Sequence, residues 1–301
     1  MAEPTVIDPL VERLLGGEAL SGDERRRLAE APDILALGMA ADQLRAQRHG
    51  RTVTFCRVAA LEVARLVDAT AEWSETAGEV RLTGALDDLP ATAAAVARVA
   101  AVAAGRVPLS GFSLADVERV SEGDIRRAQT MFEALRDAGL EVVSEAPVDA
   151  VRSLEALIGA ARAAGLLVHR LTVLRAPHDR AALLERMASI VAGDPLIRAI
   201  DPLPRVFLTS APTTGYDDVR LVALTRLLVP VEHVQVDWGR YGPKLAQVAL
   251  TFGADDLDGV SPLTETLEGR RRAPLAEVVR NIEAAGGIAV ERDGRLALRG
   301  R

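Results

Sequence analysis

The sequence predicts an α/β protein, a (β/α)8 barrel of the TIM type, and three features of its pattern lead to this fold class. Short β-branched runs alternate with amphipathic stretches of helical period along most of the chain. Eight such runs fall within about 210 residues, and eight is the strand number of this barrel. Helical stretches often end in Ala-Gly-Leu just before the next run, which is the usual turn from helix to strand. A doubly wound sheet remains an alternative, but the chain shows no GxGxxG loop.

The elements follow in a regular order, and they divide the chain into three parts. Residues 1–50 are expected to form an N-terminal helical extension, residues 51–262 the barrel, and residues 263–301 a C-terminal helix and hairpin packed on the barrel. The hairpin is expected to turn at Asp293-Gly294, because Asp-Gly favours tight turns. The expected strands are 51–57, 78–84, 106–112, 139–145, 165–175, 204–210, 231–238 and 255–260.

Composition excludes several classes of protein. The net charge is −7, with a pI near 5.3, so we expect no nucleic-acid partner, because such a partner requires a basic face. One cysteine and four histidines without metal-binding spacing predict no metal site. The apolar runs are too short and too rich in alanine to span a bilayer, and no leader pattern is visible. We therefore expect a cytoplasmic protein without membrane contact.

Functional groups of a barrel sit at the C-terminal ends of its strands, and this rule selects the candidate site residues. Glu145 and Asp237 are the candidate catalytic residues, as an acid or a base. The candidate ligand-binding residues are Cys56, Arg57, Gly84, Arg175, His178, Trp238, Arg240 and Asp258.

Four charges at successive strand ends stand out as a group: Glu145, Arg175, Asp237 and Arg240. Buried charges must be paired, so the group forms either an internal salt-bridge network or a pocket for a polar small molecule. Such a molecule would carry carboxylate and hydroxyl groups, because the guanidinium fork accepts both oxygens of a carboxylate. Both interpretations stay open.

Several single residues also allow two interpretations. Cys56 is either a small buried side chain or a thiol activated by Arg57. Trp238 either belongs to the core or stacks on a ligand. Asp258 is expected to reach the upper face of the barrel, to contact a ligand or to pair with a neighbouring strand. Asp255 and Asp256 precede the last strand and are expected at the lower face in a structural role.

One longer stretch carries a family resemblance. KLAQVALTFGADDLDGV (244–260) resembles a segment of the radical S-adenosylmethionine enzymes of the futalosine route to menaquinone, namely aminofutalosine synthase and cyclic dehypoxanthine futalosine synthase, and of the related deazaflavin-forming enzymes. Weaker similarities lie in ILALGMAADQLRAQRHGRTVTF, VPLSGFSLADVERV, PTTGYDDVRLVALTRLLV and IEAAGGIAVERD. Together they cover roughly residues 30–295 and imply a radical-SAM-like barrel.

The chain departs from this family at its cofactor motif. The family follows its first strand with C-x3-C-x2-C, whose three thiolates hold three irons of a [4Fe–4S] cluster, while S-adenosylmethionine binds the fourth. Here Cys56 is the single cysteine, and the connection to the second strand is much shorter. The glycine pair that follows the family's second strand is reduced to Gly84-Ala85. We therefore expect no cofactor and no radical chemistry.

Three functional expectations follow. The chain is either a catalytically silent relative that binds a nucleoside-like small molecule or S-adenosylmethionine, a non-radical acid/base enzyme acting on a pathway intermediate, or a structural or regulatory partner of an active paralogue. Its partners would accordingly be a small molecule, a second copy in a homodimer, or that paralogue. An open cavity lined by the charges favours the first two expectations, and a mouth filled by arginine–carboxylate pairs favours the third.

Overall fold

The computed structural model describes residues 8–66, 72–175, 179–206, 213–266, 268–269 and 271–300. Eight parallel strands form a nearly closed barrel in the order β4-β3-β2-β1-β8-β7-β6-β5. Two isolated bridges, Val142 to Leu167 and Pro147 to Thr172, join β4 to the β5 side. The strands are β1 (Thr52–Glu62), β2 (Glu79–Thr83), β3 (Leu109–Ser113), β4 (Val142–Glu145), β5 (Arg170–Val173), β6 (Ala199–Pro204), β7 (His233–Asp237) and β8 (Asp256–Val260).

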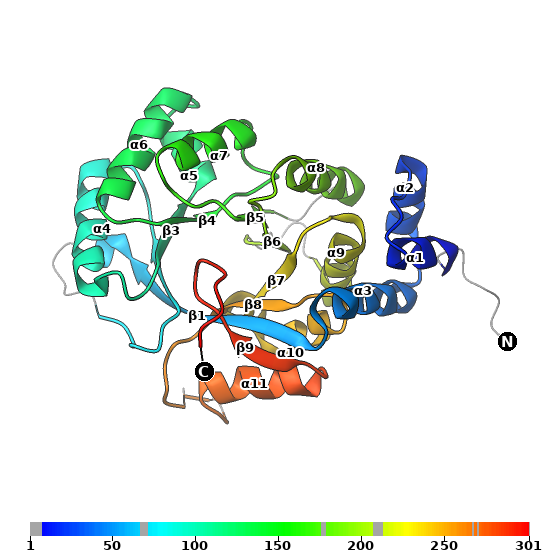
Figure 1. Ribbon diagram of the computed structural model, residues 1–301. Helices are drawn as coiled ribbons and strands as arrows, with labels where there is room; N and C mark the ends of the chain where they lie inside the picture. Colours follow the sequence, from blue (N-terminus) through cyan, green and yellow to red (C-terminus); the bar gives the residue numbers. More distant parts are fainter. Residues whose placement is uncertain are drawn as a thin grey trace.

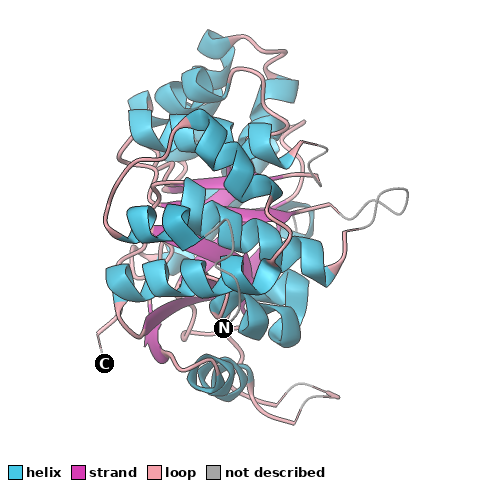
Figure 2. Ribbon diagram, turned by 90° about the vertical axis from the view of Figure 1, so that its right-hand side faces the viewer, coloured by secondary structure: helices cyan, strands magenta, loops and turns pink. Residues whose placement is uncertain are grey.

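Helices surround this barrel on the outside, as Figures 1 and 2 show. The predicted barrel fold is therefore confirmed by the arrangement of the elements. The helices of the barrel are α4 (Leu89–Ala103), α5 (Leu114–Val120), α6 (Ile125–Asp137), α7 (Leu154–Ala163), α8 (Arg180–Gly193), α9 (Gly215–Leu228) and α10 (Trp238–Leu250). Among the described residues, no helix is long and apolar enough to cross a membrane.

The connection from β1 to β2 differs from the other crossovers. Its described part contains only the short 3-10 helix η1 (Val63–Leu66), followed by coil from residue 72 to the start of β2. The other six connections between the barrel strands each contain at least one α-helix. The outer face beside α4 is consequently less covered here than elsewhere around the barrel.

Three helices precede the barrel and lie beside α9, at the right of Figure 1. They are α1 (Asp8–Leu15), α2 (Gly22–Glu30) and α3 (Ile34–His49). Asp33 caps the start of α3 by accepting from the backbone of Leu35 and Ala36, each at 3.0 Å. Gly50 is the C-cap of α3, with φ of 59°. The boundaries of the three predicted domains stay a prediction.

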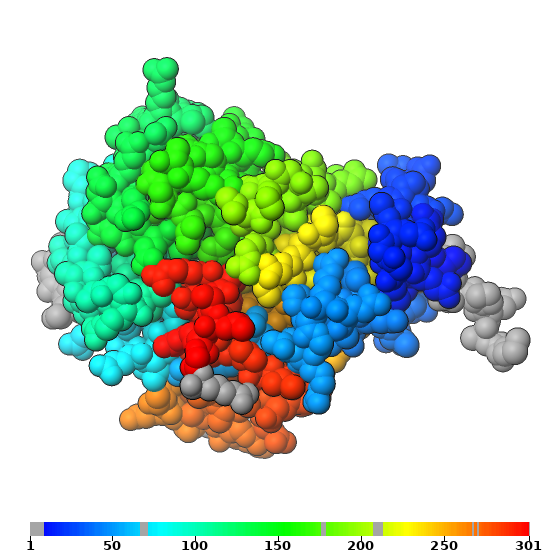
Figure 3. Space-filling model, viewed as in Figure 1, coloured from blue at the N-terminus to red at the C-terminus, as the bar shows by residue number. Residues whose placement is uncertain are grey.

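The C-terminal segment joins the barrel more closely than the sequence predicts. Helix α11 (Pro274–Ala284) leads into β9 (Ile288–Glu291), which pairs parallel with the first half of β1. The chain then turns through Asp293-Gly294, with an antiparallel bridge from Arg292 to Leu298. The amide of Gly294 donates to Gly78, just before β2, at 3.1 Å. This turn therefore covers the N-terminal end of the barrel, where Figure 3 shows it in red.

The sixth strand was predicted wrongly. The sequence favoured residues 204–210, but the structure places β6 at Ala199–Pro204, and residues 207–212 lie outside the described residues. Pro202 and Pro204 explain the error, because proline has no N–H for the ladder and is rare inside sheets. The ladder from β6 to β7 consists only of Ala199 with His233 and Ile200 with Val234, which ends before the first proline.

Candidate ligand site in the barrel interior

The barrel interior contains two groups of charged side chains rather than an apolar core alone. The first group, which we call the inner cluster, is balanced, with three guanidinium groups and three carboxylates. All six residues are buried or nearly so. The inner cluster consists of Glu79, Arg81, Arg170, Asp256, Asp258 and Arg292.

Asp258 is the centre of the inner cluster. Its carboxylate lies 2.9 Å from Arg81 and 2.7 Å from Arg170, and 3.4 Å from Arg292. Arg292 also holds both oxygens of Asp256 at 2.6 Å. Because Arg292 follows β9, this bidentate contact ties the C-terminal segment into the barrel.

The second group, the mouth cluster, lies at the C-terminal ends of β4, β6 and β7. Arg205 donates to Asp237 at 2.7 Å and lies 3.1 Å from Asp201 and 3.8 Å from Glu145. These four residues define the cluster. One guanidinium therefore faces three carboxylates, an excess of two negative charges. Arg240 at the rim, 3.5 Å from Asp237, reduces this excess to one.

The two clusters also differ in how well their polar atoms are satisfied. In the described part of the chain, five buried side-chain atoms have no hydrogen-bond partner, and none belongs to the inner cluster. Three belong to Asp201 and Arg205, since the short contact between these two groups lacks hydrogen-bond geometry. The five atoms are Thr172 Oγ1, Asp201 Oδ2, Arg205 Nε, Arg205 NH2 and Gln235 Oε1.

The pKa values of the buried carboxyl groups also differ between the inner cluster and the mouth cluster. Burial opposes ionisation of Asp258, but Arg81, Arg170 and Arg292 hold the pKa of this carboxyl well below its usual range. In the mouth cluster, burial raises the pKa of Asp201 to about 6, and Arg205 offsets this only in part. The inner carboxylate is therefore locked in its charged form, whereas Asp201 exchanges a proton near neutral pH.

The structure brings three of the four predicted strand-end charges together. Glu145 ends β4, Asp237 ends β7, and Arg240 lies in the first turn of α10, whose N-cap is Asp237. Asp237 accepts from the backbone N–H of Arg240 at 3.0 Å. Arg175 follows β5, but its side chain is exposed, and its backbone N–H donates to Asp149 at 2.9 Å. The prediction of clustered charges is thus confirmed without Arg175.

The predicted positions of Cys56 and Arg57 are wrong. The first strand continues to Glu62, so neither residue lies at its end. Cys56 is fully buried, and burial raises the pKa of its thiol well above the usual value. Arg57 makes two hydrogen bonds to Glu291 of β9, at 3.0 and 2.9 Å. β1 is longer than expected because it pairs with β9 in its first half and with β2 in its second.

Three further candidate residues, Gly84, Trp238 and His178, belong to neither charged cluster. Gly84 follows β2 as expected, with φ of 119°, a conformation that favours glycine. Trp238 is the first residue of α10 rather than part of a strand, and it is 7% exposed within the apolar core. His178 lies outside the described residues.

The three aspartates at the start of β8, Asp255, Asp256 and Asp258, lie at different depths in the barrel. Asp255 lies at the lower end of the strand and accepts from the backbone N–H of Val234 at 2.9 Å, which agrees with the expected structural role at the lower face. Asp256 is buried against Arg292, also in a structural contact. Asp258 does not reach the upper face, contrary to the prediction, because three arginines enclose it inside the barrel. A ligand contact of Asp258 stays a prediction.

Sequence reasoning missed most of the interior charges. Arg81 and Arg170 alternate with apolar residues inside short strands, and such charges usually face solvent. Arg205 was placed inside the misassigned sixth strand, and Asp201 lies before it. The sequence did contain one signal for these interior charges, namely their position within the strands. In a barrel, every second strand residue points inward, so charges at inward positions of several strands indicate an interior network.

The residues present do not fit an iron–sulfur cluster. A [4Fe–4S] cluster of the radical S-adenosylmethionine type requires three thiolates beside an open coordination position, and this chain has one cysteine. The thiol of Cys56 lies inside the barrel, 3.9 Å from Glu79, rather than in the connection after β1. Its raised pKa favours the protonated thiol, which is a poor metal ligand.

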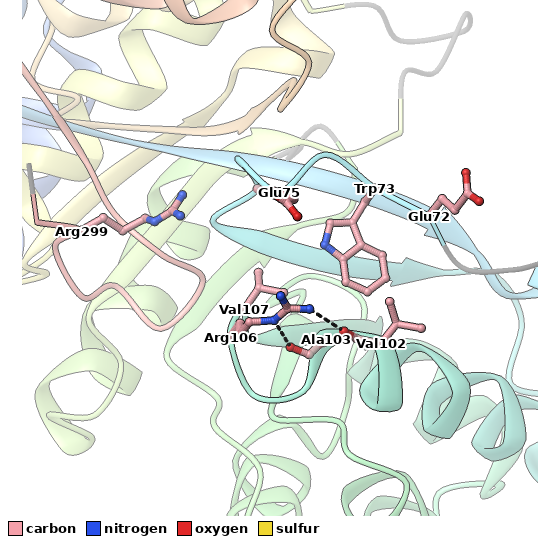
Figure 4. A pocket seen from close by; sticks show the side chains of 9 residues that line it. Glu72, Trp73, Glu75, Val102, Ala103, Arg106, Val107 and Arg299 are labelled. Carbon is pink, nitrogen blue, oxygen red and sulfur yellow. Dashed lines mark hydrogen bonds between the residues drawn. The ribbon is translucent and has the colours of Figure 1, made fainter.

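A cavity of about 560 Å³ lies outside the barrel, beside the β1–β2 connection. Figure 4 shows Trp73 from this connection facing the guanidinium of Arg106, with Val102 and Ala103 of α4 below it. Arg106 donates to the carbonyls of Val102 and Ala103 at 3.1 and 3.4 Å. The cavity lies beside the described part of this connection, which contains no α-helix, and no residue of either charged cluster lines it.

The fold defines the class of barrel to which this chain is similar. A methylornithine synthase (PylB) superposes with a TM-score of 0.65 at 15% identity, covering 93% of this chain and 97% of that one. HydG, a maturase of the [FeFe]-hydrogenase, superposes with a TM-score of 0.63 at 13% identity, covering 96% and 76%. These matches confirm the predicted (β/α)8 barrel fold.

Sequence comparison adds particular relatives, each over part of the chain. Aminodeoxyfutalosine synthase of Thermus thermophilus is 38% identical over 93 residues, which are 27% of this chain and 23% of that protein. The 5-amino-6-(D-ribitylamino)uracil--L-tyrosine 4-hydroxyphenyl transferase 2 of Methanosarcina mazei is 37% identical over 89 residues, and its counterpart from Methanothermobacter thermautotrophicus is 33% identical over 107.

The matches span 23–29% of these three relatives, and no family model matches the chain. The resemblance to the futalosine enzymes is thus confirmed as a partial similarity.

Proposed function

We propose that this barrel binds a nucleoside-like small molecule at the mouth cluster, without an iron–sulfur cluster and without radical chemistry. The observation that carries the proposal is a set of buried polar atoms without partners, three of which belong to Asp201 and Arg205 of the mouth cluster. Leaving a buried donor or acceptor unsatisfied costs about 1–3 kcal/mol each, so a molecule that satisfies several of them gains affinity.

The chemistry of these atoms favours hydroxyl groups. The five atoms include both donors, on Arg205, and acceptors, on Asp201 and Gln235. A sugar hydroxyl donates and accepts at once, so a ribosyl group suits this mixture better than a simple cation or anion. Glu145 is 26% exposed and Arg240 is 32% exposed, which gives the cluster a side open to solvent. Arg240 would there accept a carboxylate of the ligand.

Two other functions are each favoured by one observation. The pKa of Asp201, about 6, suits non-radical acid/base chemistry on the same ligand, with Glu145 and Asp237 as further carboxylates. The filled and balanced inner cluster favours a partner subunit of an active paralogue. The link to the menaquinone pathway rests on the partial similarity to aminodeoxyfutalosine synthase.

A thermal-shift screen tests the proposal. The panel contains S-adenosylmethionine, adenosine, aminofutalosine and dehypoxanthine futalosine. A ligand at 100 times its Kd adds about 2.7 kcal/mol, which is a shift of a few degrees for a chain of this size. The expected result is a shift with futalosine-type nucleosides. If no compound of the panel shifts the melting temperature, the ligand proposal is refuted and the function as a partner subunit is favoured instead.

A matched pair of variants locates the binding. Arg205→Lys keeps the charge but removes the fork of the mouth cluster, and we expect it to abolish the shift. Arg198→Lys makes the same change in an exposed pair with Glu232 and should leave the shift intact. Separately, reconstitution with iron and sulfide should yield no stable [4Fe–4S] spectrum, and such a spectrum would refute the cluster-free part of the proposal.

A further inference from the structure

Two histidines and a carboxylate that belong to neither charged cluster converge at the N-terminal end of the barrel. His49 ends α3, His233 begins β7, and Asp255 immediately precedes β8. The two imidazole rings stack with their centroids 5.2 Å apart and an interplanar angle of 22°. The three side chains are 16%, 13% and 2% exposed, so they are shielded but within reach of solvent.

The donor atoms of this trio are close enough to share one ion. One ring nitrogen of each histidine and one carboxylate oxygen all lie within 4.8 Å of one another. Oδ2 of Asp255 is 2.6 Å from Nδ1 of His233 and 3.5 Å from Nε2 of His49. Ligands bound tetrahedrally at zinc distances are separated by roughly 3.3 Å. The spacing therefore resembles that of a coordination shell.

The carboxylate is already oriented for this role. Oδ1 of Asp255 accepts from the backbone N–H of Val234 at 2.9 Å and from the buried guanidinium of Arg226. These contacts leave Oδ2 directed at the two imidazoles. Burial would raise the pKa of Asp255, but Arg226 and then His233 hold it below its usual range, so the group is ionised. Such supporting hydrogen bonds are typical of metal-binding carboxylates.

The two histidines differ in protonation. Burial lowers the pKa of His49, which leaves its ring neutral at pH 7 with a lone pair for a metal. Burial acts most strongly to lower the pKa of His233, but its hydrogen bond with Asp255 and the charges of the neighbouring carboxylates together outweigh this and raise it. A metal ion must therefore displace a proton held between His233 and Asp255, and its binding is expected to weaken as the pH falls.

We propose that His49, His233 and Asp255 form a site for a divalent transition-metal ion such as Zn²⁺ or Co²⁺. Two imidazoles and one carboxylate suit these ions, whereas Mg²⁺ and Ca²⁺ prefer oxygen ligands alone. Since the rings are nearly parallel, one imidazole must turn about its Cβ–Cγ bond to direct its lone pair at the ion. His49 would do so by giving up its 2.9 Å hydrogen bond to the carbonyl of Glu232.

The ion would join three segments that are distant in the sequence. It would fix the end of the N-terminal helical extension to β7 and β8 at the lower end of the barrel. Arg226 beside the carboxylate opposes a cation, so we expect weaker binding than at zinc sites built from four protein ligands. The site does not depend on a ligand at the mouth cluster, which is at the opposite ends of the strands.

The test is a calorimetric titration of the full, chelator-treated chain with Zn²⁺ at pH 7.5 and at pH 5.5. The expected result is one saturable site at pH 7.5, weakened at pH 5.5. His49→Ala and His233→Ala should each lower the affinity by at least about tenfold. His169→Ala is the matched control, because this half-buried histidine lies outside the trio, and its affinity should equal that of the unaltered chain.

Two results would overturn the proposal: no saturable binding at pH 7.5, or equal affinity in the unaltered chain and in both trio variants. If a trio variant does not fold, zinc X-ray absorption of the unaltered chain decides. Two imidazole nitrogens at about 2.0 Å and no sulfur would support the site, whereas one imidazole or none would refute it.

Discussion

The inner cluster and the mouth cluster occupy the same barrel but are built to opposite rules. Around Asp258, three guanidinium groups meet three carboxylates, and no described polar atom of the set is buried without a partner. Around Arg205, one guanidinium faces three carboxylates, and several buried atoms are unpartnered. A complete network stabilises a fold and needs nothing further, while an incomplete one is costly until a ligand or water completes it. We therefore assign structure to the first cluster and binding to the second.

The largest expected effect comes from breaking the inner cluster. Asp258→Asn removes the charge that three buried arginines share. Removing one partner of a buried ion pair costs about 3–5 kcal/mol, so the free energy of unfolding should fall by roughly that amount. Urea denaturation followed by circular dichroism measures it. Asp87→Asn, in an exposed pair with Arg119, is the control and should leave stability unchanged. Equal stability of both variants would contradict the structural role.

The opposite sign is expected for the matching change in the mouth cluster. The pKa of Asp201 is about 6 in the folded chain, above the usual value for aspartate. The contribution of this carboxyl to stability is thus present at pH 4 and lost as the pH rises through 6. Asp201→Asn should therefore be about 2–3 kcal/mol more stable than the unaltered chain at pH 8, with little difference at pH 4. Destabilisation at pH 8 would refute the raised pKa of Asp201.

A smaller effect concerns His169, which lies just before β5. Burial, and then Arg170 of the inner cluster, lower the pKa of His169 to about 3. The unfolded chain binds this proton near pH 6.5, so stability falls as the pH decreases from 6.5 towards 3. The ring is only partly shielded from solvent, so we expect about 1–2 kcal/mol. His169→Gln should reduce the loss of unfolding free energy between pH 7 and pH 4.5, measured by urea denaturation at both pH values. An unchanged loss would argue against a lowered pKa of His169.

The smallest expected effect concerns Cys56, for which the reactivity of the thiol is measured rather than stability. This thiol is buried beside the inner cluster, and its raised pKa keeps it protonated. Native protein should therefore resist iodoacetamide at pH 8, while protein unfolded in urea should react at the rate of a free cysteine. Mass spectrometry of timed samples measures the difference. Rapid modification of the native chain would indicate that the inner cluster opens to solvent.

The sequence was sufficient to predict the barrel architecture, but not the ion pairs between side chains inside the barrel. Alternating runs identified seven of the eight strands, and two prolines concealed the sixth. Glu145, Asp237 and Arg240 were found because strand ends are recognisable. Arg205 and Arg292 were not, because most of their partners belong to distant strands and no local sequence pattern indicates these pairs. His49 and His233 escaped for the same reason, since metal-ligand spacing is recognisable only between neighbours in the chain.

The most direct test of the contrast between the clusters follows the side-chain Nε–H resonances of the arginines by NMR during titration with adenosine and aminofutalosine. Arg205 Nε has no partner now, while Arg81, Arg170 and Arg292 all donate through Nε. We expect the Arg205 resonance to move with a saturable dependence on ligand concentration and the other three resonances to stay in place. Movement of the inner three without Arg205, or no movement in any of the four, would contradict this expectation.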